Sequence, residues 1–373
     1  MPRTVPDDWD VVVRLLPADW ASQARALNAL RRARGIADAE TLLRVLLIHL
    51  MSGCSLKETV LRAQEAGLCS ISAVALLKRL RASEQWLRWL AEHFWRERGT
   101  ALEVGGRRLR VVDGTIISEP GPTGSQWRVH FAINLATLQC DHFELTDVRG
   151  GESLRRVPVQ AGDVVLGDRG YARAPGIGYV AGAGGDVLVR LHAQSLPLYT
   201  AKGKRMSLLS RVRRLKIGMR GDWQAFVHGP DGPIQGRLIA VKRSRASAQC
   251  VRLKMKRRAR HNKQEVSAQA LELGGYVLIW TTLPDPGYPT KLVLEMYRWR
   301  WQIELAIKRM KSIMGLGALP KHSDASSRAW LHGKLFVALL MERLWYEAES
   351  LSPWGYPLER RSKSLARDAV PVP

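Results

Sequence analysis

A change of sequence pattern near residue 107 constrains the fold of this chain more than any other feature. Residues 20 to about 100 are rich in Leu, Ala and Arg and contain few Gly or Pro, which is typical of packed helices. From Arg107 onward, short apolar runs are bounded by turn residues, as β-strands are. A long helical pattern follows them near residue 300. The sequence therefore predicts an N-terminal helical domain followed by an α/β core.

Two of the expected strands run directly into an acidic residue. Leu109 to Val112 leads into Asp113, and Val164 to Leu166 leads through a glycine into Asp168. Because each acid stands at the end of an apolar strand, the two carboxylates are candidate ligands of a metal ion. Asp-Gly is also a common turn, and an acid after a strand often caps something, so neither aspartate is decisive alone. The other strands are expected over residues 127–138, 142–148, 187–191 and 276–280.

The helix expected over residues 291–314 carries a charged face. Tyr297, Arg300, Glu304 and Lys311 have the offsets 0, 3, 7 and 14. On an α-helix these positions fall within an arc of about 60°, so one carboxylate is flanked by two cations and a phenol. This combination suits a metal ion, or a phosphate that the cations would hold. A separate apolar stripe can be buried; it comprises Trp299, Ile303, Ala306, Met310 and Ile313.

The net charge indicates a polyanionic partner. The chain has 373 residues with 58 Lys and Arg against 34 Asp and Glu, a formal charge of +24. Nucleic acid is the simplest partner for such an excess, and a well-solvated surface is the alternative. Residues 195–275 are expected to form a β-rich insertion with mobile basic loops. Its basic cluster at residues 242–263 is expected to face DNA, with Lys254, Arg257 and Arg258 as candidate contacts.

Several other classes of protein are disfavoured. No segment reaches the roughly 20 apolar residues of a membrane span, and the N-terminus lacks the apolar core of a signal peptide. Cys54, Cys69, Cys140 and Cys250 are scattered, which argues against a disulfide framework or a zinc site. The expected location is the prokaryotic cytoplasm, near the nucleoid when the protein is bound to DNA, with no membrane partner.

The N-terminal region contains a helix pair. Ser55 to Glu58 forms a capping box that should begin a helix ending near Glu65. A glycine turn and a second helix, Ile71 to Arg81, follow, and the last turn of that helix is basic. This arrangement is compatible with a helix-turn-helix DNA reader and equally with an ordinary helical hairpin.

At this point the chain resembles a known family. Asp113, Asp168 and Glu304 are similar to the DDE triad of transposases with an RNase H-like core. The helix matches the Tyr-x2-Arg-x3-Glu-x6-Lys signature of the bacterial insertion-sequence-four family at every spaced position. The segments Gly151 to Leu154 and Gly167 to Tyr171 also resemble that family, and the likeness extends over roughly residues 25–345.

The resemblance implies roles for individual residues. The triad would hold two Mg2+ ions, for which Mn2+ could substitute, and Tyr297, Arg300 and Lys311 would contact DNA phosphates. Some members of the family cut through a hairpin in which a flipped base stacks on tryptophan. Trp223 and Trp280 are candidates for that role, with core packing as the alternative for each. Glu152 is either a further acidic contributor or a surface acid.

The domain organisation expected from these patterns has five parts. They are an N-terminal helical DNA-binding domain at 1–104, an RNase H-like core at 105–194 and 276–350, the β-rich basic insertion at 195–275, and a loose tail at 351–373.

The expected activity is that of a DNA transposase. It would bind terminal inverted repeats of double-stranded DNA and perform cut-and-paste cleavage and strand transfer through hairpin ends, as a homodimer on DNA. A non-catalytic DNA-binding protein derived from a transposase and a metal-dependent nuclease that never joins DNA are the alternatives.

Overall fold

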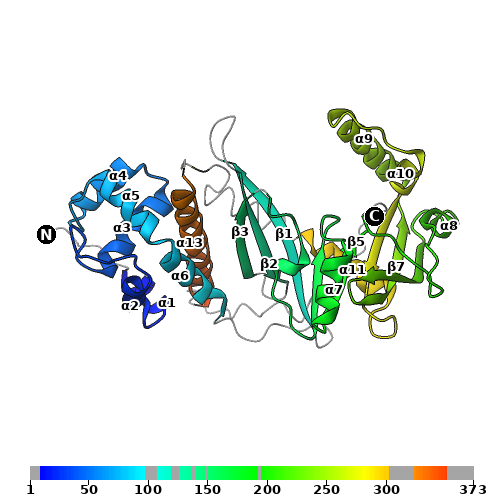
Figure 1. Cartoon of the computed structure of the whole chain (residues 1–373), viewed down its shortest axis with the longest axis horizontal. Coiled ribbons are helices and arrows are strands. Elements are labelled where there is room, and N and C mark those ends of the chain that lie inside the picture. Colours follow the sequence, from blue (N-terminus) through cyan, green and yellow to red (C-terminus); the bar gives the residue numbers. More distant parts are fainter. Residues whose placement is uncertain are drawn as a thin grey trace. The chain divides into compact units, whose positions relative to one another are not determined.

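The chain folds into two compact units. The computed structural model describes residues 9–96, 107–118, 126–135, 139–147, 149–191, 195–301, 319 and 323–350 (Figure 1). The first unit combines residues 1–98, 119–124 and 310–373, and the second combines residues 99–118 and 125–309. Glu304 and Lys311 of the predicted helix face lie outside the described residues. No described helix is long and apolar enough to cross a membrane.

The first unit is helical, as the sequence predicts. Ser55 Oγ accepts a hydrogen bond from the backbone N–H of Glu58 at 3.2 Å, which confirms the predicted start of helix α4. Helix α13 packs against α3, α5 and α6, and its residues 329–340 are buried. The described helices of this unit are α1 (Trp9–Leu15), α2 (Trp20–Ala26), α3 (Ala39–Ser52), α4 (Leu56–Glu65), α5 (Ala73–Ala82), α6 (Glu84–Arg96) and α13 (Asp324–Ser350).

The second unit is built on a mixed eight-stranded sheet in the order β3-β2-β1-β4-β5-β8-β7-β6. Strands β1, β4 and β5 are parallel, and antiparallel pairs extend the sheet on both sides of them. This is an α/β fold with an RNase H-like core. The strands are β1 (Arg108–Ser118), β2 (Gln126–Asn134), β3 (Gln139–Asp147), β4 (Asp163–Gly167), β5 (Asp186–Arg190), β6 (Arg220–Gly229), β7 (Gly232–Lys242) and β8 (Tyr276–Thr281).

Helices cover both faces of the central strands. The core on one face includes Leu278 and Trp280 of β8 together with Ile177 of helix α7 (Ala174–Gly182). Because side chains alternate along a strand, Ile279 points to the other face, where helix α11 (Thr290–Trp299) lies. The short elements η1 (Leu154–Arg156) and α8 (Leu208–Val212) also contribute residues to the α7-side core.

Strand β1 differs from the prediction. The sequence suggested that the strand ends before Asp113, but it continues to Ser118. The reason is its antiparallel neighbour: β2 pairs with β1 as far as Ser118, whereas β4 pairs with β1 only as far as Val111. Asp113 is therefore inside its strand, just past the point where the neighbouring strand β4 stops.

The basic segment after β7 is also different from the prediction. A β-rich insertion with mobile basic loops was expected over residues 195–275, but within its second basic cluster residues Arg245–His261 form helix α9, which is followed by α10 (Ala268–Leu273). Ser244 caps α9, and the helix contains neither Gly nor Pro, while Val251, Met255 and Ala259 recur every four residues. Strands β6 and β7 join the central sheet through β8. The predicted domain boundaries remain predictions.

Candidate active site

The parallel sheet brings the two predicted aspartates together. Val111 of β1 is paired with Leu166 of β4, and continuing this register places Asp113 beside Asp168. Each carboxylate accepts a hydrogen bond from the backbone N–H of a glycine one or two residues further along the chain. The N–H of Gly114 donates to Oδ1 of Asp113 at 2.8 Å, and the N–H of Gly170 donates to Oδ1 of Asp168 at 2.7 Å. Both side chains are thereby fixed at one edge of the sheet.

The carboxyl group of Asp113 has an unusual proton affinity. Burial is the main reason why its pKa rises from 3.8 to about 6, and the nearby charges of Asp168 and Glu152 raise it further. The Gly114 N–H and the guanidinium of Arg300 act in the opposite direction. A buried carboxylate beside other carboxylates is short of positive charge, and a divalent cation would supply it.

Helix α11 brings part of the predicted face to this site. Nη1 of Arg300, at the C-terminal end of the helix, lies 4.0 Å from Oδ2 of Asp113. The Arg300 guanidinium also lies 6.0 Å from the ring centre of Tyr297. The Tyr297 hydroxyl is buried with no hydrogen-bond partner among the described residues, and burial raises its pKa. The structure therefore places Arg300 beside Asp113 and Tyr297 beside Arg300, and their predicted contact with DNA phosphates stays a prediction.

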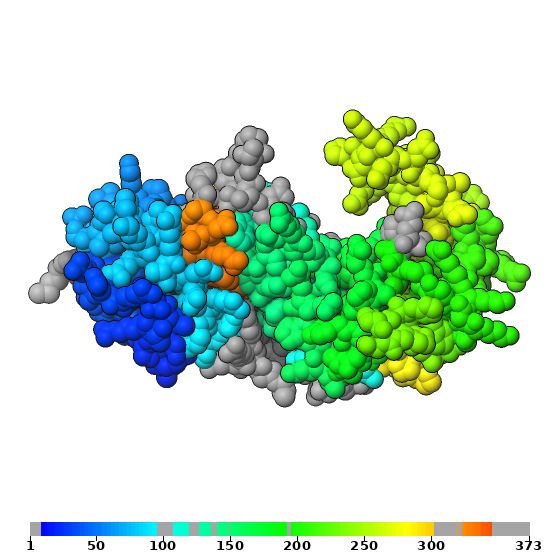
Figure 2. Space-filling view, viewed as in Figure 1, coloured from blue at the N-terminus to red at the C-terminus, as the bar shows by residue number. Residues whose placement is uncertain are grey.

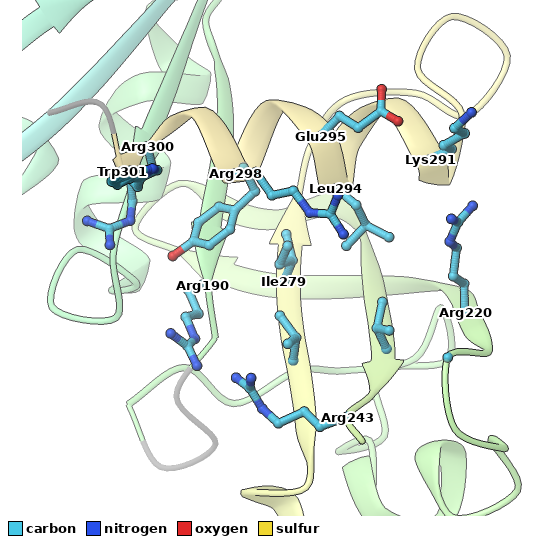
Figure 3. A pocket seen from close by; sticks show the side chains of 14 residues that line it. Arg190, Arg220, Arg243, Ile279, Lys291, Leu294, Glu295, Arg298, Arg300 and Trp301 are labelled. Carbon is cyan, nitrogen blue, oxygen red and sulfur yellow. The ribbon is translucent and has the colours of Figure 1, made fainter. Parts of the chain in front are cut away.

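A basic cleft lies between α11 and the sheet (Figure 3). Its volume is about 490 Å³, and Glu295 is the one acidic residue among those that line it. The guanidinium ends of Arg190 and Arg243 point toward each other in Figure 3. The cationic residues of the cleft are Arg190, Arg220, Arg243, Lys291, Arg298 and Arg300.

Several arginines of this region carry positive charges that nearby acidic groups do not fully neutralise. Burial lowers the pKa of Arg243, and the neighbouring charge of Arg190 lowers it further. Burial and Arg190 also lower the pKa of Arg169, which follows Asp168. The Nε atoms of Arg169 and Arg243 have no hydrogen-bond partner among the residues that the structure describes. Arginines held together in this way favour an anion, and a phosphate group suits their planar donors.

The remaining predicted contacts lie away from this cluster. Trp280 is fully buried in the sheet core and its indole N–H donates to the carbonyl of Ala225 at 3.3 Å, so no base can stack on it as placed here. Trp223 is half-buried and packs against the same core. Lys254, Arg257 and Arg258 are exposed on α9, which stands out from its unit in Figure 2.

Sequence reasoning missed Arg190 as a member of the site, although a signal was present. Arg190 ends β5, which runs parallel to β4, so its side chain reaches the same sheet edge as Asp168. The apolar run from Val187 to Val189, followed by Arg190, is typical of a buried strand that ends in a charged residue. Arg243 was noted only as one of many basic residues, and its burial depends on tertiary contacts that the sequence does not display.

The described residues supply part of a metal site. Among them, no three His, Cys, Asp or Glu side chains are close enough to hold an ion. Asp113 and Asp168 fit two of the ligands, because their carboxylates lie close together and the charge of Asp168 raises the pKa of the buried Asp113. Glu304, the third predicted ligand, lies outside the described residues.

Comparisons with known proteins agree on one family. Residues 104–341 match the family model described as the transposase DDE domain. The chain is 36% identical over 346 residues to the InsL protein for insertion sequence element IS186A of Escherichia coli (strain K12), which covers 90% of this chain and 93% of that protein. It is also 36% identical over 347 residues to the transposase for insertion sequence element IS421 of Escherichia coli, with the same coverage.

Proposed function

Because this chain belongs to the DDE transposase family of bacterial insertion sequences, we propose that it cleaves the ends of its element and joins them to target DNA. The observation that carries the proposal is the nearness of Asp113 to Asp168 at the ends of paired strands, with Arg300 beside Asp113. Two carboxylates and a cation at one sheet edge suit displacement at a phosphodiester. The substrate would be the terminal inverted repeats of double-stranded DNA.

Divalent cations complete the proposed centre. Asp113, Asp168 and Glu304 would hold two Mg2+ ions, or Mn2+ in their place, which when bound would stabilise charge on the attacking and leaving oxygens. The Gly114 and Gly170 N–H groups keep the two aspartate carboxylates in place. Arg300 and Tyr297 would position the phosphate next to the cleaved bond, with Lys311 as a further contact.

The basic cleft and α9 would bind the DNA backbone. Arg190 and Arg243 lie on the same sheet face as Arg300 and would hold a phosphate near the centre. Lys254, Arg257 and Arg258 project from α9, which contains no acidic residue, and would contact phosphates farther along the duplex. These contacts would carry affinity and position the DNA without reading its sequence.

The proposed reaction is a series of in-line displacements at phosphorus. Water would attack the phosphodiester at the element's end, breaking the bond to a 3′-oxygen and leaving a 3′-hydroxyl. That hydroxyl would attack the phosphodiester of the opposite strand, forming a hairpin and displacing the 3′-oxygen of the flanking DNA as a hydroxyl. A second water would open the hairpin and restore the 3′-hydroxyl before strand transfer. A homodimer on DNA in the bacterial cytoplasm would process both ends together.

A cleavage assay on labelled DNA from the borders of the element tests this function. Mg2+-dependent nicks and hairpins at the border, absent for Glu304→Gln, are the expected result. Full cleavage by Glu304→Gln would refute the assignment of the triad. Binding without cleavage would indicate a non-catalytic DNA-binding protein, and cleavage without any strand-transfer product would indicate a nuclease.

A further inference from the structure

Glu152 lies beside the two glycines whose N–H groups orient the catalytic aspartates, and it does not belong to the triad. A Cβ atom placed on Gly114 would lie 3.4 Å from Cγ and 3.6 Å from Oε1 of Glu152. A Cβ atom placed on Gly170 would overlap Oε2 of Glu152 and lie 3.2 Å from Oδ1 of Asp168. The Glu152 side chain therefore spans the space between the two glycines that orient the catalytic carboxylates.

The sheet explains how a third acid reaches this place. Successive side chains of a strand point to opposite faces, so Gly114 faces the side away from Asp113. Gly114 has no side chain, and Glu152 occupies the space that a side chain would fill. At the end of β4 there is no further strand to separate the faces, so Glu152 and Asp168 meet around Gly170.

Tyr171 provides an independent sign that this space takes a ligand. Its side chain is 2% exposed, and its hydroxyl has no hydrogen-bond partner among the described residues. Its pKa is raised by burial first, and then by the nearby charges of Asp113, Glu152 and Asp168. A buried hydroxyl with no partner among the described residues, close to three acids, marks a polar place that can accept a further group.

We propose that Glu152 is a further carboxylate of the divalent-cation site and acts together with Asp168. It would add negative charge from the α7 side of the sheet, where Asp113 does not reach. Burial and Asp168 raise the pKa of Glu152, whereas Arg128 and Arg173 lower it. This inference rests on the proposed function, because it assumes that Asp113 and Asp168 bind the cation.

The test measures Mn2+ binding to the full chain without DNA. The electron paramagnetic resonance signal of free Mn2+ reports how much of the ion remains unbound. Glu152→Gln keeps the side-chain shape between the glycines and removes the charge. The expected result is an apparent Kd for Mn2+ raised about tenfold, typical of groups that support metal ligands. Glu144→Gln is the matched control, because Glu144 is ion-paired with Arg156 at 2.7 Å, and it should bind Mn2+ as the wild type does.

The outcomes separate this inference from the proposed function. Unchanged Mn2+ affinity in Glu152→Gln, with or without lower thermal stability, would overturn the inference and leave Glu152 a structural acid. If Asp113→Asn also bound Mn2+ as tightly as the wild type, the cation site itself would be wrong. If Glu152→Gln fails to fold, Glu152→Asp is measured instead, because it keeps the charge on a shorter side chain. Unchanged Mn2+ affinity in folded Glu152→Asp would count against a ligand role that requires the side chain to reach Asp168.

Discussion

The guanidinium of Arg300 lies 4.0 Å from the carboxylate of Asp113, so the end of α11 meets the middle of β1. Two motifs that are far apart in the sequence thus form one site. Arg300 lowers the pKa of Asp113, but the opposing effects of burial, Asp168 and Glu152 dominate, and the pKa remains about 6. The Asp113 carboxylate therefore carries an unfavourable charge at neutral pH, which has consequences for stability.

Asp113→Asn should stabilise the metal-free protein at pH 8 and not at pH 4. The pKa of Asp113 is about 6 in the folded chain against an ordinary value of 3.8, so ionisation above pH 6 opposes folding. The gain in unfolding free energy at pH 8 should be about 1–3 kcal/mol. Thermal unfolding in EDTA measures it, and added Mg2+ should stabilise only the wild type. An equal effect at both pH values would contradict the assigned cause.

Arg243→Gln should weaken DNA binding without lowering stability. Burial and Arg190 already disfavour the charge of Arg243, so its removal relieves repulsion in the free protein. One phosphate contact would be lost, and the slope of log K against log salt should fall by about 1. Arg213→Gln is the control, because Arg213 is paired with Glu272 on the surface at 2.8 Å. Loss of stability with unchanged DNA affinity would show a structural role instead.

Neutralising α9 tests the outer DNA contacts. The triple change of Lys254, Arg257 and Arg258 to Gln should reduce the salt slope of DNA binding by about 3. The effect should be the same for border and unrelated duplexes, because backbone contacts carry no sequence information. A triple change to Gln at the exposed residues Arg211, Arg214 and Lys216 removes the same charge. Equal losses in both triples would indicate a general charge effect and no particular role for α9.

Local signals predicted the parts of the fold that local interactions determine. Helix α4 begins just after Ser55 because the Ser55 side chain accepts a hydrogen bond from the backbone N–H of Glu58, only three residues along the chain. The apolar runs before Asp113 and Asp168 became adjacent parallel strands. The sequence placed each aspartate after an apolar strand and Arg300 on a charged helix face, but the 4.0 Å approach of Arg300 to Asp113 is a tertiary contact that the sequence did not predict.

Tertiary partners determined what the sequence did not predict. Helix α9 was not predicted because its many charged residues obscure a narrow apolar stripe. Met255 of this stripe packs near Gly274. Arg190 and Arg243 enter the cleft because strands β5 and β7 are held on either side of β8, a pairing that joins segments far apart in the chain. Trp280 lies in the core because its side of β8 faces α7.

Trp280→Phe should lower stability and leave hairpin formation unchanged. Trp280 is fully buried, and its indole N–H bonds to the carbonyl of Ala225, so the smaller ring leaves a cavity and an unpaired acceptor. The loss in unfolding free energy should be about 1–3 kcal/mol. Denaturant unfolding measures this loss, and hairpin products are then compared at a temperature where both proteins are folded. Loss of hairpins at unchanged stability would restore the base-stacking role.

Gly170→Ala should disable the catalytic centre although it adds only one methyl group. The new Cβ would overlap Oε2 of Glu152 and lie 3.2 Å from Oδ1 of Asp168, so both carboxylates would have to move. The N–H that orients Asp168 belongs to the same residue and would move with them. Displacements of this size should reduce Mg2+-dependent cleavage on the order of 100-fold, with DNA binding retained.

Gly151→Ala is the matched control for that change, because a Cβ atom there meets nothing within 4 Å. It alters the same loop next to Glu152 and should cleave DNA as the wild type does. Cleavage rates under single-turnover conditions, with Mn2+ affinity measured in parallel, compare the two variants. If Gly170→Ala cut at the rate of Gly151→Ala, the close contact between Gly170, Glu152 and Asp168 would have no catalytic significance. A site that tolerates the methyl group cannot depend on the positions of those two carboxylates.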